Sequence, residues 1–477
     1  MIHDQARYAR EEESVREPLL SEKGEATVDV TASSPLPDDL TRDELTLPDV
    51  SEPEIARHYT RLSQMNWAID SGPYPLGSCT MKYNPKFTED IAADPNAAVH
   101  PDRPDRTLQG NLELQHRLQG FLADIGGMDA VTLQPPAGAA GEFTGILIAK
   151  AYHERHGNDR SEVVIPASAH GTNFATAALA GYDVVELPSG EDGRVDFEAL
   201  EAAVGDDTAA LMLTNPNTVG LFERDIEAIA DLVHDAGGLL YYDGANLNAL
   251  LGRGRPGDMG FDVMHYNVHK TFATPHGGGG PGAGPVGVTD ELAPFLPGPR
   301  VRESETGSGY ERFTPSESIG KVHGFEGNWQ VLIKAYAYIA RLGDEGLSDA
   351  AAKAVLNANY LAERIDLDVP FEPFHHEFAA TAGDRDAADI AKRMLDFGVH
   401  PPTTKWPEMV PEAMLTEPTE IESRSSLDDL AAAFNAAYAD DDESLETAPN
   451  RTAAARIDQA DAARNPRLSW QALDEDT

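Results

Sequence analysis

The middle of the chain alternates short apolar, β-branched runs with helical segments, and this alternation limits the possible folds more than any other feature. Between about residues 130 and 270, runs such as "EVVIP", "TAALMLT" and "GLLYYDG" are separated by helical patterns such as "RDIEAIADLVHDAG". Strands that alternate with helices predict a mostly parallel, doubly wound α/β sheet. In such sheets ligands bind at the carboxyl ends of the strands, so residues that directly follow each run are candidates for chemistry.

The flanking regions differ in composition from this core and divide the chain into four predicted parts. Residues 1–69 are charged and form an N-terminal arm with a helix near its end, and 70–305 form the large domain. The helix-rich stretch 306–440, with a few strand-like pieces, predicts a smaller C-terminal α+β domain. Residues 441–477 are polar and acidic, and we expect them to form a mobile tail.

The charge balance excludes some partners and indicates a habitat. The chain has 81 acidic and 37 basic residues, a net charge of −44, spread along its length. Nucleic-acid binding depends on clustered Lys and Arg, so we expect none. A surface this acidic is typical of a halophilic protein, because concentrated salt screens the self-repulsion.

The chain contains no run near the ~18 apolar residues of a membrane span and no signal-peptide pattern, so we expect a cytoplasmic protein that binds no membrane. Cys79 is the single cysteine, which excludes an intrachain disulfide and any multi-cysteine metal site. Its thiol fits either a redox-sensitive group or a small buried side chain.

Lys270 is one of ten lysines and ends the apolar run "FDVMHYNVHK". Loss of solvation at the end of a buried strand would lower its pKa toward the neutral amine. A neutral amine can form a Schiff base with an aldehyde, which suggests pyridoxal phosphate as the cofactor. An ordinary lysine that reaches solvent is the alternative. The glycine cluster follows the lysine instead of preceding it, which excludes a nucleotide P-loop.

Other strand ends supply the remaining parts of a pyridoxal phosphate site, although each also fits a plain structural role. Asp243 could pair with the pyridine nitrogen or form a turn before Gly244. The small residues Gly138–Gly141 open a helix, where backbone N–H groups could bind a phosphate. His170 could lie against the ring or cap the following helix, and Asn215 could reach a ring substituent or form an Asn-Pro turn.

A metal site is the main alternative in the lysine segment. His265, His269 and His276 could offer ligands, but the glutamate of an H-E-x-x-H motif is absent and no second ligand motif stands out. We therefore expect no metal.

Seven segments, taken together and in order, resemble a known family. They are "PLGSCTMKYNP", "QPPAGAAGE", "IPASAHGTN", "LTNPNTVGLFE", "YYDGANLNALLG", "NVHKTFATPHGGGGPGAGPVGV" and "EPTEIESRSSLDDL", and they are distributed across nearly the whole range 70–435. The chain resembles the pyridoxal-phosphate P-proteins of the glycine cleavage system, the glycine dehydrogenases (decarboxylating), and specifically subunit 2 of their split form. The terminal arms are not covered.

The resemblance implies a fold-type I pyridoxal-phosphate transferase, the aminotransferase-like fold. It implies Lys270 as the Schiff-base lysine, Asp243 as the partner of the ring nitrogen and His170 as a catalytic, ring-stacking group. Further cofactor contacts would come from Gly138, Ala139, Ala140, Gly141, Asn215 and His269, and the substrate mouth from Ser78, Cys79 and Thr80. Ala140 departs from the relatives, which often carry His or Gln there, so any contact at this position would come from the backbone.

The implied activity is decarboxylation of glycine, with transfer of the aminomethyl group to the lipoyl arm of the H-protein. The implied partner is P-protein subunit 1, in a two-plus-two heterotetramer. Another pyridoxal-phosphate enzyme, such as an aminotransferase or an amino-acid decarboxylase, is the alternative within the same fold. A cofactor-free sister subunit is a further alternative, but the intact Lys270, Asp243 and His170 argue against it.

Overall fold

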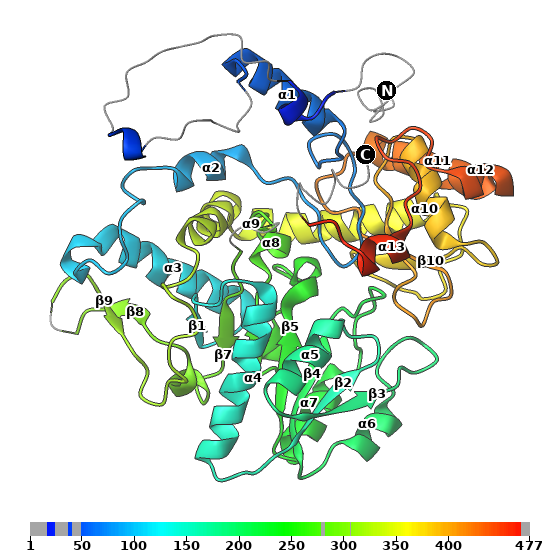
Figure 1. Cartoon of the computed structure of the whole chain (residues 1–477). Helices are drawn as coiled ribbons and strands as arrows, with labels where there is room; N and C mark the ends of the chain where they lie inside the picture. The colour runs from blue at the N-terminus through cyan, green and yellow to red at the C-terminus, as the bar shows by residue number, and fades with distance from the viewer. Residues whose placement is uncertain (1–16, 24–36, 41–48, 278–281, 306, 469–477) are drawn as a thin grey trace.

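The computed structural model of the chain describes residues 17–23, 37–40, 49–277, 282–305 and 307–468 (Figure 1). Much of the glycine cluster that follows Lys270 falls on 278–281, outside the described residues, as does much of the predicted N-terminal arm. Within the described part, the arm contains α1 (Glu52–Gln64), as its helical apolar spacing predicts.

A seven-stranded sheet forms the centre of the larger part of the molecule. Its strand order is β1-β7-β6-β5-β4-β2-β3. The strands are β1 (Ala130–Thr132), β2 (Glu162–Pro166), β3 (Asp183–Leu187), β4 (Thr208–Thr214), β5 (Leu239–Asp243), β6 (Val263–His265) and β7 (Val286–Val288). All pairs are parallel except those of β7, which runs antiparallel to β1 and β6. The predicted mostly parallel sheet is therefore confirmed.

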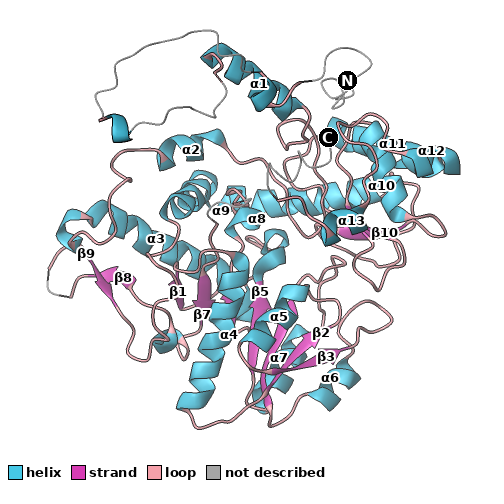
Figure 2. Ribbon diagram, viewed as in Figure 1, coloured by secondary structure: helices cyan, strands magenta, loops and turns pink. Residues whose placement is uncertain are grey.

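Alternate residues of the strands enter two separate cores, because successive side chains point to opposite faces of a sheet. Tyr241 packs with helices α4 (Gly138–Arg155) and α5 (Gly171–Leu179), whereas its neighbour Tyr242 packs on the opposite face. That face is covered by α3 (Gln109–Gly126), α6 (Phe197–Ala203), α7 (Ile226–Asp235) and the start of α9 (Trp329–Ala362). Figure 2 shows the strands enclosed between these helices.

A third core surrounds the small antiparallel sheet β10-β12-β11. Its strands are β10 (Phe378–Thr381), β11 (Thr403–Thr404) and β12 (Ala413–Thr416), packed with α10 (Ala387–Asp396), α11 (Arg424–Ala439) and the second half of α9. Helix α9 kinks at Gly343 (φ 61°), which divides it into two halves. The remaining helices are α2 (Lys86–Ala92), α8 (Val268–Thr271), α12 (Asp442–Thr447) and α13 (Gln459–Arg464), with 3-10 turns at Leu20–Glu22, Asp38–Leu40, Asp105–Thr107, Gly244–Ala249, Pro256–Met259 and Ala293–Phe295.

Two of the predicted boundaries need correction. The division between 305 and 306 cuts a hairpin, because β8 (Arg300–Glu303) pairs with β9 (Tyr310–Phe313) against α3. The tail predicted to be mobile from 441 is docked at its start. There α12 buries Leu445, and the carboxylate of Asp396 accepts hydrogen bonds from the backbone of the following segment 450–451. The sequence did not predict this docking, because one buried leucine and a backbone contact produce no periodic pattern of apolar residues. The other boundaries remain predictions.

None of the helices in the described part of the chain is both long and apolar enough to cross a membrane.

Gly244 should be sensitive to the smallest possible substitution. A Cβ at this position would collide with the backbone carbonyl of His265, at the point where β5 and β6 end side by side. We expect Gly244→Ala to lower the free energy of unfolding by roughly 1–3 kcal/mol, as overpacking does. Gly120→Ala, on the exposed face of α3 with nothing within 4 Å, should instead stabilise by about 0.5–1 kcal/mol. Thermal unfolding of both variants measures the difference, and equal effects would contradict it.

Candidate active site

One cavity collects most of the polar residues that the sequence predicts at strand ends. It encloses about 310 Å³ and lies at the carboxyl ends of the parallel strands, the usual ligand position in an open α/β sheet. Of the predicted site residues, it is lined by Ser78, Gly138, Ala139, His170, Asp243, His269 and Lys270. Its other lining residues are Ala137, Glu142, Thr172, Ala245, His265, Asn267 and His276.

Lys270 reaches the cavity from α8, a single helical turn that follows β6. The expectation that it ends the strand itself is wrong, because β6 stops at His265 and the chain turns at Asn267. The Asn267 carbonyl accepts the backbone N–H groups of Lys270 and Thr271, which forms the turn. The turn carries the lysine away from the sheet and leaves it half-buried at the cavity wall.

Asp243 is a buried carboxylate at the end of β5. Burial opposes its ionisation, but the nearby His265 and Lys270 and hydrogen bonds from two N–H donors outweigh burial and lower the pKa of this carboxyl. The donors are the Ala245 backbone N–H, at 3.0 Å, and the Asn173 side-chain amide, at 3.1 Å. The cavity therefore contains a fixed negative charge.

His265 lies beside Asp243, and each group favours the charged form of the other, but burial leaves the His265 ring neutral near pH 7. Burial lowers the pKa of His265 to about 4. The Tyr241 hydroxyl lies 2.9 Å from its Nδ1, and its Nε2 lies 3.4 Å from Asp243. The histidine considered as a metal ligand is thus part of a polar network around the carboxylate.

Glu142 is a cavity residue that the sequence interpretation missed. Burial and the charge of Asp243 raise the pKa of Glu142 to about 9, so the group holds a proton at neutral pH. The amide of Asn173 bridges the two carboxyls by donating to both. A glutamate inside the otherwise apolar helical run "GEFTGILIA" was the available signal.

The start of α4 forms a narrow backbone-lined recess beside the lysine. Its N-cap, Ala137, makes no side-chain hydrogen bond to the first turn, so the amides there are not capped by a side chain. A Cβ at Gly138 would collide with the side-chain oxygen of Asn267 and come within 3.6 Å of the His269 ring. Burial lowers the pKa of His269 to about 3, so its ring is neutral. The recess suits an anion, because helix N-termini present partial positive charge.

His170 has one of its two predicted roles, the cap of the following helix, and its place against a cofactor ring stays a prediction. It is the N-cap of α5, where its Nδ1 accepts the Thr172 backbone N–H at 3.2 Å, and its ring also lines the cavity. Burial, with a smaller contribution from Lys270, lowers its pKa. The ring of Trp406 approaches it edge-on, at 6.0 Å between centroids.

The other predicted site residues lie behind the lining. Gly141 packs against the backbone of Gly284, and Ala140 follows the recess without lining it. Asn215 is buried, and its side-chain oxygen accepts the Glu223 backbone N–H at 3.0 Å. Cys79 and Thr80 adjoin Ser78 outside the cavity; burial raises the pKa of the Cys79 thiol.

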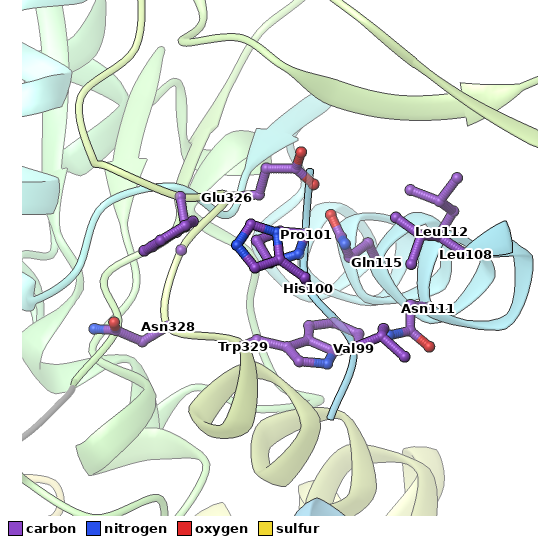
Figure 3. Close-up of a pocket in the computed structure, with 12 residues that line it drawn as sticks. Val99, His100, Pro101, Leu108, Asn111, Leu112, Gln115, Glu326, Asn328 and Trp329 are labelled. Carbon is purple, nitrogen blue, oxygen red and sulfur yellow. The ribbon is translucent and has the colours of Figure 1, made fainter. Parts of the chain in front are cut away.

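A second cavity, of about 290 Å³, lies between α3 and the segment that leads into α9 (Figure 3). Its walls are largely apolar and amide groups, including Leu112, Gln115 and Trp329. Glu326 lies at its edge, paired with Arg312 at 2.6 Å. The groups suited to chemistry are therefore concentrated in the first cavity.

Comparison with known proteins is consistent along the chain. The family model "Glycine dehydrogenase, C-terminal domain" matches residues 350–456, and "Aminotransferase class-V" matches residues 139–298. A probable glycine dehydrogenase (decarboxylating) subunit 2 from Halobacterium salinarum is 73% identical over 473 residues, 99% of each chain. One from Thermoplasma volcanium is 52% identical, covering 91% of this chain and 93% of the relative.

Solved structures support the same fold. A crystal structure of glycine decarboxylase (P-protein) of the glycine cleavage system, in inhibitor-bound form, matches with a TM-score of 0.71 at 22% identity, over 84% of this chain and 93% of the other. Glutamate decarboxylase from Lactobacillus brevis matches with a TM-score of 0.63 at 14% identity, over 84% and 96%. With the class-V match, these likenesses confirm the predicted fold-type I, aminotransferase-like architecture. On the sequence identity, the chain belongs to the family of glycine dehydrogenase (decarboxylating) subunit 2.

Proposed function

We propose that this chain binds pyridoxal phosphate and decarboxylates glycine, passing the aminomethyl group to the lipoyl arm of the H-protein. The observation that carries the proposal is the amine of Lys270 facing the same cavity as the buried, ionised Asp243. The uncapped, backbone-lined start of α4 adds an anion site to this pair. An amine, a carboxylate and an anion recess in one enclosure fit the aldehyde, ring nitrogen and phosphate of this cofactor.

Each lining residue has a distinct part in the proposal. Lys270 holds the aldehyde carbon, Asp243 keeps a proton on the ring nitrogen, and His170 covers the ring. The amides of Gly138–Gly141, with His269 beside them, receive the phosphate. Bound there, the cofactor supplies an electron sink for the electron pair released with CO2.

The protonation states of the lining favour this arrangement. Glu142 holds its proton, so Asp243 is left as the charged carboxyl of the pair and attracts a protonated ring nitrogen. His170 is neutral, and because its Nδ1 accepts the Thr172 N–H that caps α5, its ring proton lies on Nε2, which can donate a hydrogen bond toward the cavity.

The proposed partners follow from the family name, since a subunit 2 implies a subunit 1. We propose a two-plus-two heterotetramer with P-protein subunit 1, acting in the cytoplasm and visited by the lipoylated H-protein. The net charge of −44 supports a role in concentrated salt, in line with the Halobacterium relative.

Borohydride tests the lysine without measuring activity. Reduction of the chain loaded with pyridoxal phosphate should fix the cofactor on Lys270, detected by peptide mass mapping. Lys82 is an internal control, because it is buried nearby but its amine is held by Asn248, the Thr271 carbonyl and Glu420. Lys270→Ala should abolish both the label and the exchange of the glycine carboxyl with CO2. A label on Lys82, or full exchange by Lys270→Ala, would refute the assignment.

Asp243→Asn tests the negative charge that is proposed to pair with the ring nitrogen of the cofactor. The amide keeps the size of the side chain but removes the charge, so we expect turnover to fall by roughly 10²–10³-fold, as when one electrostatic group is removed. Borohydride labelling of Lys270 should persist. Asp262→Asn, which removes a carboxylate that accepts the Leu240 backbone N–H away from the cavity, is the control and should retain turnover. Equal rates in the two variants would contradict the role.

The H-protein separates this proposal from another pyridoxal-phosphate enzyme. We expect CO2 release from carboxyl-labelled glycine to increase strongly when lipoylated H-protein is added, with subunit 1 present. Unlipoylated H-protein is the control and should have no such effect. Comparable release from a bulkier amino acid, or indifference to the lipoyl group, would favour an ordinary amino-acid decarboxylase or aminotransferase.

A further inference from the structure

The loop at the edge of the cavity has an unfavourable backbone. Ser78 and Thr80, on either side of Cys79, both adopt positive φ angles, 64° and 47°. Residues with a Cβ rarely adopt this left-handed conformation, because the side chain crowds the following carbonyl. Surrounding contacts must therefore hold the loop.

Two buried glutamates provide those contacts. The backbone N–H of Ser78 donates to Glu377 Oε2 at 2.9 Å. Thr80 donates to Glu417 twice, from its backbone N–H at 3.0 Å and from its hydroxyl at 2.6 Å. Both glutamates are fully buried. They lie side by side, because Glu377 precedes β10 and Glu417 follows β12 where Phe378 pairs with Thr416.

The loop in turn contacts the cavity at two points. Ser78 is itself a lining residue. The Thr80 carbonyl accepts a hydrogen bond from His276, which also lines the cavity and meets the His269 ring edge-on at 4.9 Å. A continuous set of contacts therefore runs from Glu417 through Thr80 and His276 to the residue beside Lys270.

We propose that Glu377 and Glu417 are positioning residues, which hold the loop Ser78–Thr80 in its left-handed conformation and thereby fix Ser78 and His276 at the cavity. Neither glutamate lines the cavity, so each acts through the loop. That the cavity is an active site rests on the proposed function, whereas the role of the two glutamates in holding the loop does not.

The two carboxyls share one negative charge. Burial raises the pKa of both, to about 7 for Glu417 and further for Glu377. The nearby His376 is not a cation, because burial lowers its pKa to about 3. The Thr80 hydroxyl and amide stabilise the charge on Glu417, so Glu377 is the member that keeps a proton. A glutamine at either position keeps one acceptor oxygen but turns its N–H groups toward the other donor, so it should hold the loop less well than glutamate and better than alanine.

A bound metal ion is the competing explanation for this cluster. One ligand atom each of His376, Glu377 and Glu417 lies within 4.8 Å of the others, and both ring nitrogens of His376 lack a hydrogen-bond partner. However, every oxygen of the two carboxyls already accepts a hydrogen bond, from Ser78, Thr80 or the Asn246 amide. These donors favour the loop-holding role.

Cys79 offers a direct test, because it is the single cysteine and lies between the two held residues. The alkylation rate of the full chain by iodoacetamide, compared at a pH high enough to ionise the thiol in every variant, reports how often the loop opens, because both glutamates, in addition to burial, raise the pKa of the Cys79 thiol. We expect Glu417→Ala and Glu377→Ala to raise this rate by roughly tenfold or more, as expected when hydrogen bonds to charged or buried acceptors are lost. Glu377→Gln and Glu417→Gln should each give a rate between that of the natural chain and that of the corresponding alanine variant.

Glu223→Ala is the matched control. Glu223 is also buried and accepts a backbone N–H, from Val195, but it belongs to neither the loop nor the cavity. The alkylation rate of Cys79 in this variant should equal that in the natural chain. In Glu377→Ala and Glu417→Ala, borohydride labelling of Lys270 should persist, whereas the KM for glycine should rise.

Three outcomes would overturn the inference. They are unchanged alkylation in both alanine variants, an equal rise in Glu223→Ala, or one equivalent of metal in the purified chain that is lost with Glu417→Ala. If the natural chain neither binds pyridoxal phosphate nor exchanges glycine, the proposed function fails, and the alkylation rates still decide the role of the pair.

Discussion

A single buried negative charge, on Asp243, is the constraint on which the site depends. A carboxylate in the interior is unfavourable unless hydrogen bonds and nearby charge compensate for lost water. Asp243 lies at the carboxyl end of β5. The Asn173 amide from α5 and the Ala245 N–H from the turn after β5 donate hydrogen bonds to it. Lys270, on the turn after β6, is close enough to favour the ionised form. The parallel sheet matters because the carboxyl ends of its strands, which these groups follow, lie side by side.

The remaining carboxyls near the cavity avoid adding to that charge. Burial keeps a proton on Glu142, and the Glu377–Glu417 pair carries one charge between two groups. In a chain with a net charge of −44, the interior of the site is thus much less negative than the composition suggests. Through this pair, the end of the small sheet β10-β12-β11 contacts the loop beside the cavity.

Much of the fold was predictable, because strands and helices leave local periodic patterns. The alternating runs around "EVVIP" and "GLLYYDG" identified the parallel sheet. Lys270, Asp243 and His170, the residues predicted at strand ends, line one cavity. Errors arose where local pattern is weak. Three features depend on contacts that no local periodicity marks. They are the turn that moves Lys270 off β6, the β8–β9 hairpin across 305 and the docked start of the tail.

The sequence by itself determined the secondary structure of the core, the family, and which residue types stand at strand ends, since each is written in neighbouring residues. Only the tertiary structure decided which polar groups meet. Glu142 and Asp243 are brought together through Asn173, and Glu377 reaches Ser78 across 299 positions of the chain. No local pattern encodes such contacts. Burial then sets their charge, because a carboxyl holds or loses its proton according to the solvent and donors around it.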